Sequence, residues 1–168
     1  MNMTVNDLAA EIKRQQAMKK DFLARSWGGF QMDPDGTHLE IEGLSSCRLR
    51  DYAHGDLSAF TEIPKPYYDR MRRDQPTLLA TNVNHWLEAK QSEQRLIRTL
   101  AGETRAVLSN KFRPLDHSDL IQAALPALYE HPSIEIRKCE LTERKLYLTA
   151  ILPKLQFEVR VEIGRAHV

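Results

Sequence analysis

One segment of the chain combines the two residue types that contact nucleic acids. Lys65-Pro-Tyr-Tyr-Asp-Arg-Met-Arg-Arg73 interleaves cations with aromatic rings. Cations neutralise phosphates, and rings stack on unpaired bases. The pattern therefore predicts a nucleic-acid-binding segment, whose candidate residues are Lys65, Tyr67, Tyr68, Arg70, Arg72 and Arg73. The alternative is an amphipathic helix that buries Tyr67 or Tyr68 together with Met71 and leaves its arginines in solvent.

The charge along the chain is uneven. Residues 65–113 carry ten Lys and Arg against five Asp and Glu, although the whole chain has a formal net charge of only +1. Such a basic block favours DNA or RNA as a partner. Arg98 and Arg105 lie in this block and complete the candidate binding residues. The alternative is a solvated surface on which these arginines pair locally with Glu93 and Glu103.

Two short clusters place carboxylates beside a histidine. The first is Asp51-Tyr-Ala-His54-Gly-Asp56 and the second is Asp116-His117-Ser-Asp119. Histidine next to carboxylates is typical of metal and acid–base sites. Both clusters also stand where helices are expected to begin, where Asp and Ser cap backbone N–H groups. Capping is the favoured interpretation, so the sequence assigns no catalytic residue and no metal site.

Cofactor and membrane signals are missing from the sequence. It has neither a G-x-x-x-x-G-K-[ST] loop nor a G-x-G-x-x-G loop, so no nucleotide cofactor is predicted. Cys47 and Cys139 lack the spacing of a zinc site or a disulfide framework, and they suit a reducing compartment. No apolar run is long enough to cross a bilayer. The expected location is the cytoplasm, without a membrane partner.

The pattern of apolar residues predicts alternating helices and hairpins. Helices are expected from Thr4 or Asn6 to about Arg25, over Ala53–Phe60 and Lys65–Arg73, from Pro76 through Leu87, and after a cap at Asp116 or Ser118. Antiparallel hairpins are expected over Phe30–Glu42, Arg95–Ser109 and Ser133–Leu152, followed by a strand over Leu155–Val161. In the helix that begins at Pro76, the residues expected to face the core are Leu78, Val83, Trp86 and Leu87.

This order of elements predicts the α+β class. Hairpins rather than single strands separate the helices, so we expect an antiparallel sheet built from hairpins, with helices packed mainly on one face. A length of 168 residues and an apolar fraction of 42% suit one domain, over residues 1–161.

The last residues, 162–168, differ in character from what precedes them. The alternation of Leu155–Val161 breaks at Gly164, and Glu162-Ile-Gly-Arg-Ala-His-Val168 can be back-translated into the start of a widely used sequencing adapter. We therefore expect 162–168 to be a non-native tail and the natural domain to continue past Val161.

Several stretches resemble a known family. They are Ile63-Pro-Lys-Pro-Tyr-Tyr-Asp-Arg-Met71, Leu79-Ala-Thr-Asn-Val-Asn-His-Trp86, Arg98-Thr-Leu-Ala-Gly-Glu-Thr-Arg105-Ala-Val-Leu-Ser109 and Phe112-Arg-Pro-Leu-Asp-His117. Together they resemble the bacterial and phage family of domain of unknown function 932, described as phage/plasmid-like proteins. The resemblance implies a mobile genetic element. It implies no catalytic residues, because the family has none established.

Three functional hypotheses follow from these observations. The first is a phage or plasmid accessory protein that binds nucleic acid, in particular single strands, through its basic middle third. The second is an enzyme whose site is completed by a missing C-terminal part, with His54 and His117 as candidates. The third is a protein-interaction or counter-defence module.

Overall fold

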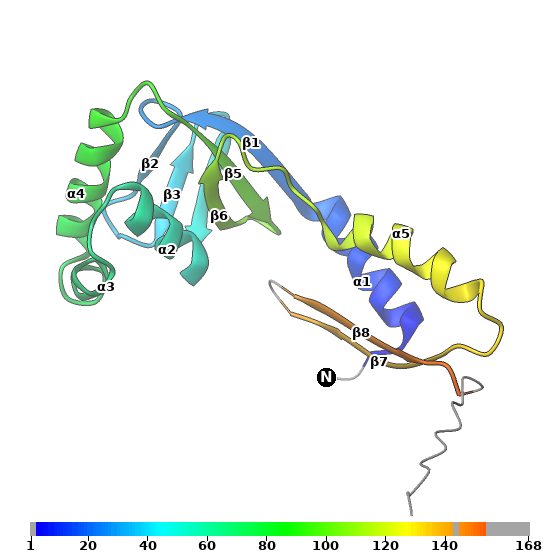
Figure 1. The fold of residues 1–168 in the computed structure, drawn as a ribbon. Helices are drawn as coiled ribbons and strands as arrows, with labels where there is room; N and C mark the ends of the chain where they lie inside the picture. Colours follow the sequence, from blue (N-terminus) through cyan, green and yellow to red (C-terminus); the bar gives the residue numbers. More distant parts are fainter. Residues whose placement is uncertain (1–2, 143–144, 154–168) are drawn as a thin grey trace, which may run out of the picture. The chain divides into compact units, whose positions relative to one another are not determined.

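The computed structural model describes residues 3–142 and 145–153. Within the span that the sequence suggests as one domain, the chain forms two compact units (Figure 1). The larger unit comprises Arg14–Pro114, and the smaller comprises Met1–Lys13 with Leu115–Val168. The predicted strand over Leu155–Val161 and the tail 162–168 lie outside the described residues. No helix in the described ranges has both the length and the apolar character needed to cross a bilayer.

The larger unit contains a six-stranded sheet with the order β1-β5-β6-β4-β3-β2. The strands are β1 (Lys19–Arg25), β2 (Phe30–Met32), β3 (His38–Ile41), β4 (Leu44–Leu49), β5 (Gln94–Leu100) and β6 (Glu103–Ser109). The α+β prediction is confirmed, but the sheet is mixed rather than purely antiparallel, because β4 and β6 pair in parallel. The three helices that follow β4 return the chain to the sheet, so that the β5–β6 hairpin enters between β1 and β4.

The first two predicted hairpins are confirmed. β2 pairs with β3 across the Asp33–Gly36 turn, where Gly36 has a positive φ of 66°. β5 pairs with β6 across Ala101 and Gly102, which both have positive φ, at 53° and 81°. Two successive positive φ values match the twist of a tight hairpin, and glycine adopts them without strain.

Two assignments were wrong near the start of the larger unit. The first helix, α1 (Val5–Met18), ends before Arg25, and residues 19–25 form β1 instead. β1 pairs with β5 along its whole length, from Lys19 opposite Leu100 to Arg25 opposite Gln94. This long-range pairing decides the conformation, although the local sequence suits a helix. The strand β4 had no counterpart in the prediction, and it begins after Gly43, whose φ is 76°.

Three helices pack on one face of the sheet. They are α2 (Asp51–Phe60), α3 (Lys65–Asp74) and α4 (Pro76–Ala89), close to their predicted bounds. Their buried residues form one cluster with alternate strand residues such as Phe30 and Met32 of β2. Asn84 of α4 also binds the backbone of β2, because its side chain accepts from the N–H of Met32 at 2.8 Å and donates to the carbonyl of Met32 at 2.9 Å.

The predicted core face of α4 was half right. Val83 and Leu87 are fully buried, as expected. Leu78 and Trp86 are instead 44% and 43% exposed, and Leu79 and Ala80 take the inner positions. The apolar stripe of α4 is wider than the surface of the helix that packs against the sheet and α3. Leu78 and Trp86 lie at the edge of this stripe and remain partly in solvent.

The smaller unit combines parts from both ends of the chain. It contains the first residues of α1, helix α5 (His117–Tyr129) and the antiparallel pair β7 (Glu135–Leu141) and β8 (Leu146–Ile151). The third predicted hairpin is therefore confirmed. Leu8, Ile12, Ile121 and Cys139 form its buried cluster. The predicted cap at Asp116 is also confirmed, because a capping box joins Asp116 and Asp119.

Candidate nucleic-acid interface

Helix α3 begins at a sharp break in the chain. Ile63 is followed by Pro64, whose carbonyl accepts the N–H groups of Tyr67 and Tyr68 at 2.9 Å and so starts the helix. Pro66 falls in the first turn, where its missing N–H costs no helical hydrogen bond. Of the ten residues of α3, Tyr68 and Met71 are buried. The remaining positions of the helix are therefore presented at or near the surface.

The two tyrosines of α3 lie in different environments. Tyr68 is fully buried, and its hydroxyl lies 2.9 Å from Nδ1 of His54 on α2. Burial raises the pKa of Tyr68. Tyr68 thus occupies the core position of the amphipathic-helix alternative and does not reach solvent. Tyr67 is 49% exposed, so its ring is accessible from solvent.

The cations of α3 lie on its outer surface, and most of them have acidic neighbours. Lys65 pairs with Asp69 one turn later on the same helix. Arg72 contacts Asp51 of α2 at 2.9 Å, and Arg73 contacts Asp74 at 2.7 Å. These ion pairs lower the pKa of Asp51 and of Asp74.

Arg70 differs from the other cations of α3. It is exposed, and within the described ranges it forms no direct ion pair, although its charge contributes to the lowered pKa of Asp74 one turn later. It follows Tyr67 by three residues, so the two side chains project from the same side of the helix. An exposed ring and an unpaired guanidinium are therefore adjacent on α3.

Arg98 and Arg105 lie on strands of the sheet rather than on α3. The Arg98 guanidinium contacts Asp21, its cross-strand partner on β1, at 3.0 Å. The Arg98 side chain is only 9% exposed, so its charge is paired with Asp21 and largely shielded from solvent. Arg105 is half-buried on β6. The eight candidate residues therefore divide into a group on α3 and two strand residues.

The alternative in which arginines of the basic block pair locally with Glu93 and Glu103 is found in part. Arg95 contacts Glu93 at 3.0 Å, as the charge-pairing alternative expected. Glu103 pairs instead with Arg50, at 2.8 Å, across the parallel β4–β6 contact.

His54, the first candidate for an enzymatic role, is a core residue. It is fully buried, and its Nε2 atom has no hydrogen-bond partner among the described residues. Burial, with a smaller contribution from the nearby Arg72, lowers the pKa of His54 to about 4. Asp56 accepts the backbone N–H of Val107 at 3.0 Å and so links α2 to β6.

The second histidine cluster is built around the start of α5. Asp119 accepts the N–H of Asp116 at 2.9 Å as part of the capping box, and His117 is the first residue of the helix. No group of three or more His, Cys, Asp and Glu side chains in the described ranges could hold a metal ion.

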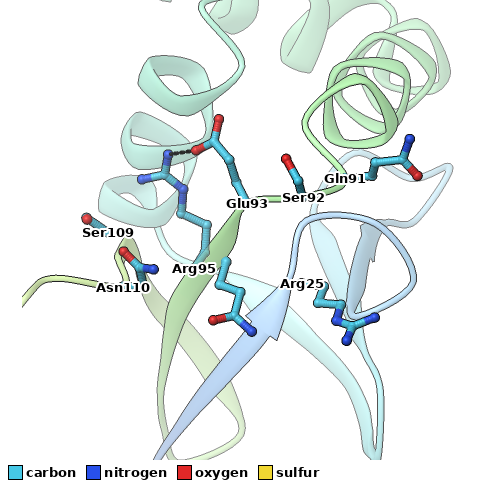
Figure 2. A pocket seen from close by; sticks show the side chains of 8 residues that line it. Arg25, Gln91, Ser92, Glu93, Arg95, Ser109 and Asn110 are labelled. Atoms are coloured by element: carbon cyan, nitrogen blue, oxygen red, sulfur yellow. Dashed lines mark hydrogen bonds and ion pairs between the residues drawn. The ribbon is translucent and has the colours of Figure 1, made fainter.

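A pocket that the sequence analysis missed lies at one end of the sheet (Figure 2). Its volume is about 520 Å³, and its lining comes from the end of β1, the turn before β5 and the end of β6. The lining residues are Arg25, Gln91, Ser92, Glu93, Gln94, Arg95, Ser109 and Asn110. The available signal was the polar run Gln91–Arg95 directly after an amphipathic helix, of which the prediction used only Arg95, as the first residue of a hairpin.

Comparisons of this chain with protein-family models, curated proteins and solved structures gave no match. The resemblance to the phage/plasmid-like family therefore stays a prediction.

Proposed function

We propose that the protein binds single-stranded nucleic acid through the exposed face of α3. The observation that carries this proposal is the adjacent pair of Tyr67 and Arg70, both exposed and one helical turn apart. A ring beside a guanidinium can contact a base and its phosphate together. The phage and plasmid context implied by the family resemblance is consistent with such an activity.

The neighbouring cations extend this surface. Lys65 and Arg73 stand near the two ends of α3, and their partners Asp69 and Asp74 belong to the same helix. Ion pairs between exposed side chains contribute little to stability and are screened by salt. A phosphate can therefore replace either carboxylate without disturbing the fold.

Single strands are favoured over duplexes because stacking needs an accessible base face. Duplex bases are already stacked on their neighbours, whereas a single strand exposes them. Tyr67 supplies the ring for this contact, and the buried Tyr68 fixes the helix beneath it through its hydroxyl contact with His54.

Salt dependence of oligonucleotide binding tests the proposal. Fluorescence anisotropy with labelled single-stranded DNA and RNA should show affinity that falls linearly on a log–log plot against salt. Each lost phosphate contact lowers the slope by about 0.7. Arg70→Ala combined with Arg73→Ala should therefore lower it by about 1.4.

The matched control is Arg48→Ala, which removes an exposed arginine of β4 in the same unit and should leave the slope unchanged. The proposal fails if the folded wild-type protein binds no oligonucleotide at low salt, or if the double variant keeps the wild-type slope.

A further inference from the structure

The pocket at the end of the sheet has a lining without apolar side chains. All eight residues around its 520 Å³ are charged or carry an amide or a hydroxyl group. Pockets for drug-like molecules are lined mainly by apolar and aromatic groups. This pocket therefore suits a small hydrophilic ligand, in which most atoms can form hydrogen bonds.

Several of the lining side chains have unused hydrogen-bonding capacity. Gln91, Ser92 and Asn110 make no side-chain hydrogen bond within the described ranges, and neither does the guanidinium of Arg25. Ser109 is partly used, because its hydroxyl accepts the N–H of Lys111 at 3.2 Å.

The charges of the pocket favour an anion. Arg25 and Arg95 outnumber Glu93, the acidic residue of the lining. Arg95 is fixed in place, since its guanidinium lies 3.6 Å from the ring centre of Phe60 and binds Glu93 at 3.0 Å. Glu93 therefore neutralises the charge of Arg95. Arg25 is then the cation of the lining that remains available to a ligand.

The loop after β1 packs against the backbone of Arg25. A Cβ atom at Gly29 would lie 2.6 Å from both the backbone N and the backbone O of Arg25, so only a glycine allows this close packing. Ala24 and Arg25 lie opposite Arg95 and Gln94, and successive strand residues point to opposite faces. Arg25 and Arg95 accordingly extend in different directions around the end of the sheet (Figure 2).

We infer that this sheet-end pocket binds a phosphate monoester of a small polar molecule. The phosphate binds the free guanidinium of Arg25, which offers paired donors to two phosphate oxygens. The hydroxyl or amide groups of the ligand then bind Ser92, Gln91 and Asn110. A nucleoside monophosphate has this chemistry, and a volume of about 520 Å³ is within the range of small-molecule sites. The inference does not rest on the proposed function of α3.

Calorimetric titration of the full chain tests this inference with adenosine 5′-monophosphate, inorganic phosphate and adenosine. The monophosphate should bind more tightly than inorganic phosphate, and adenosine should give no measurable heat. Arg25→Gln should weaken binding of the monophosphate by about tenfold or more, because a charge-assisted contact is lost. Asn110→Ala should weaken binding of the monophosphate and leave that of inorganic phosphate unchanged.

Arg48→Gln serves as the control, because it removes an exposed arginine of the same unit that lines neither the pocket nor α3; this variant should bind the monophosphate as the wild type does. The inference is overturned if the monophosphate gives no heat at millimolar concentration, or if Arg25→Gln, with an unchanged circular dichroism spectrum, binds it with wild-type affinity.

The source of the phosphate is distinguished by a second pair of ligands. If a 5′-phosphorylated oligonucleotide binds more tightly than its unphosphorylated form, and Arg25→Gln removes the difference, the pocket holds the end of a nucleic acid strand. If the two oligonucleotides bind equally while the monophosphate still binds, the pocket holds a free small molecule.

Discussion

The buried imidazole of His54 links the stability of the larger unit to pH. Its Nδ1 atom contacts the Tyr68 hydroxyl at 2.9 Å, and burial lowers its pKa from 6.5 to about 4. The unfolded chain therefore binds a proton more readily than the folded chain between these two values. Stability must then fall as the pH drops below 6.5, and this contribution is fully lost below about pH 4.

The size of the effect follows from the shift in pKa. One pKa unit corresponds to about 1.4 kcal/mol, so the full shift corresponds to about 3 kcal/mol. Between pH 7 and pH 5 the loss should be about 2 kcal/mol, because the unfolded imidazole is mostly protonated at the lower pH while the folded one is mostly neutral.

The variant His54→Gln separates this contribution from those of other groups. Its amide can still hydrogen-bond to the Tyr68 hydroxyl but does not titrate. Urea unfolding at the two pH values should show that the wild type loses about 2 kcal/mol more than the variant. His85→Gln removes an exposed histidine of α4 and should keep the full wild-type loss. Equal losses in the wild type and His54→Gln would refute the assignment of this pH dependence to the buried imidazole.

Three further predictions concern single sites. Leu87→Ala should cost about 2–5 kcal/mol, because Leu87 is fully buried, whereas the half-exposed Trp86→Ala should cost clearly less in the same urea titrations. Gly29→Ala should destabilise the larger unit by about 1–3 kcal/mol, since its Cβ would meet the Arg25 backbone; a thermal melt identical to that of the wild type would show that the loop adapts freely. Asp116→Ala should cost about 0.5–2 kcal/mol through loss of the α5 capping box, with amide hydrogen exchange fastest in the first turn of that helix.

Local signals in the sequence were sufficient for most elements of the fold. The first two hairpins were predicted with the help of turn glycines that tolerate positive φ, Gly36 and Gly102, and the third was predicted from the strand pattern on either side of its turn. α3 and α4 were predicted with the help of a proline in the first turn of each, and α5 from a cap at Asp116 or Ser118 before an apolar run. These features act within a few residues, so they can be read before any tertiary contact is known.

Long-range pairing explains the errors. Lys19–Arg25 became a strand because β5, about seventy residues later in the chain, offers a complete antiparallel partner. The parallel contact between β4 and β6 has no local signature at all. The same limit applies to the site: the sequence named Tyr67 and Tyr68 together, and only the packing of α3 shows which of them is buried. Arg25 and Asn110 line the same pocket because β1, β5 and β6 are neighbours in the sheet. The spacing of these residues in the sequence does not reveal that arrangement.

The most direct test of the proposed function is to map the contact with nucleic acid on the protein. Two-dimensional ¹H–¹⁵N spectra of the full chain would be recorded during titration with a single-stranded oligothymidylate about ten nucleotides long. We predict the largest shifts within α3, centred on Tyr67 and Arg70, and their disappearance in Tyr67→Ala combined with Arg70→Ala. Unchanged spectra at saturating oligonucleotide, or shifts that avoid α3, would contradict the account.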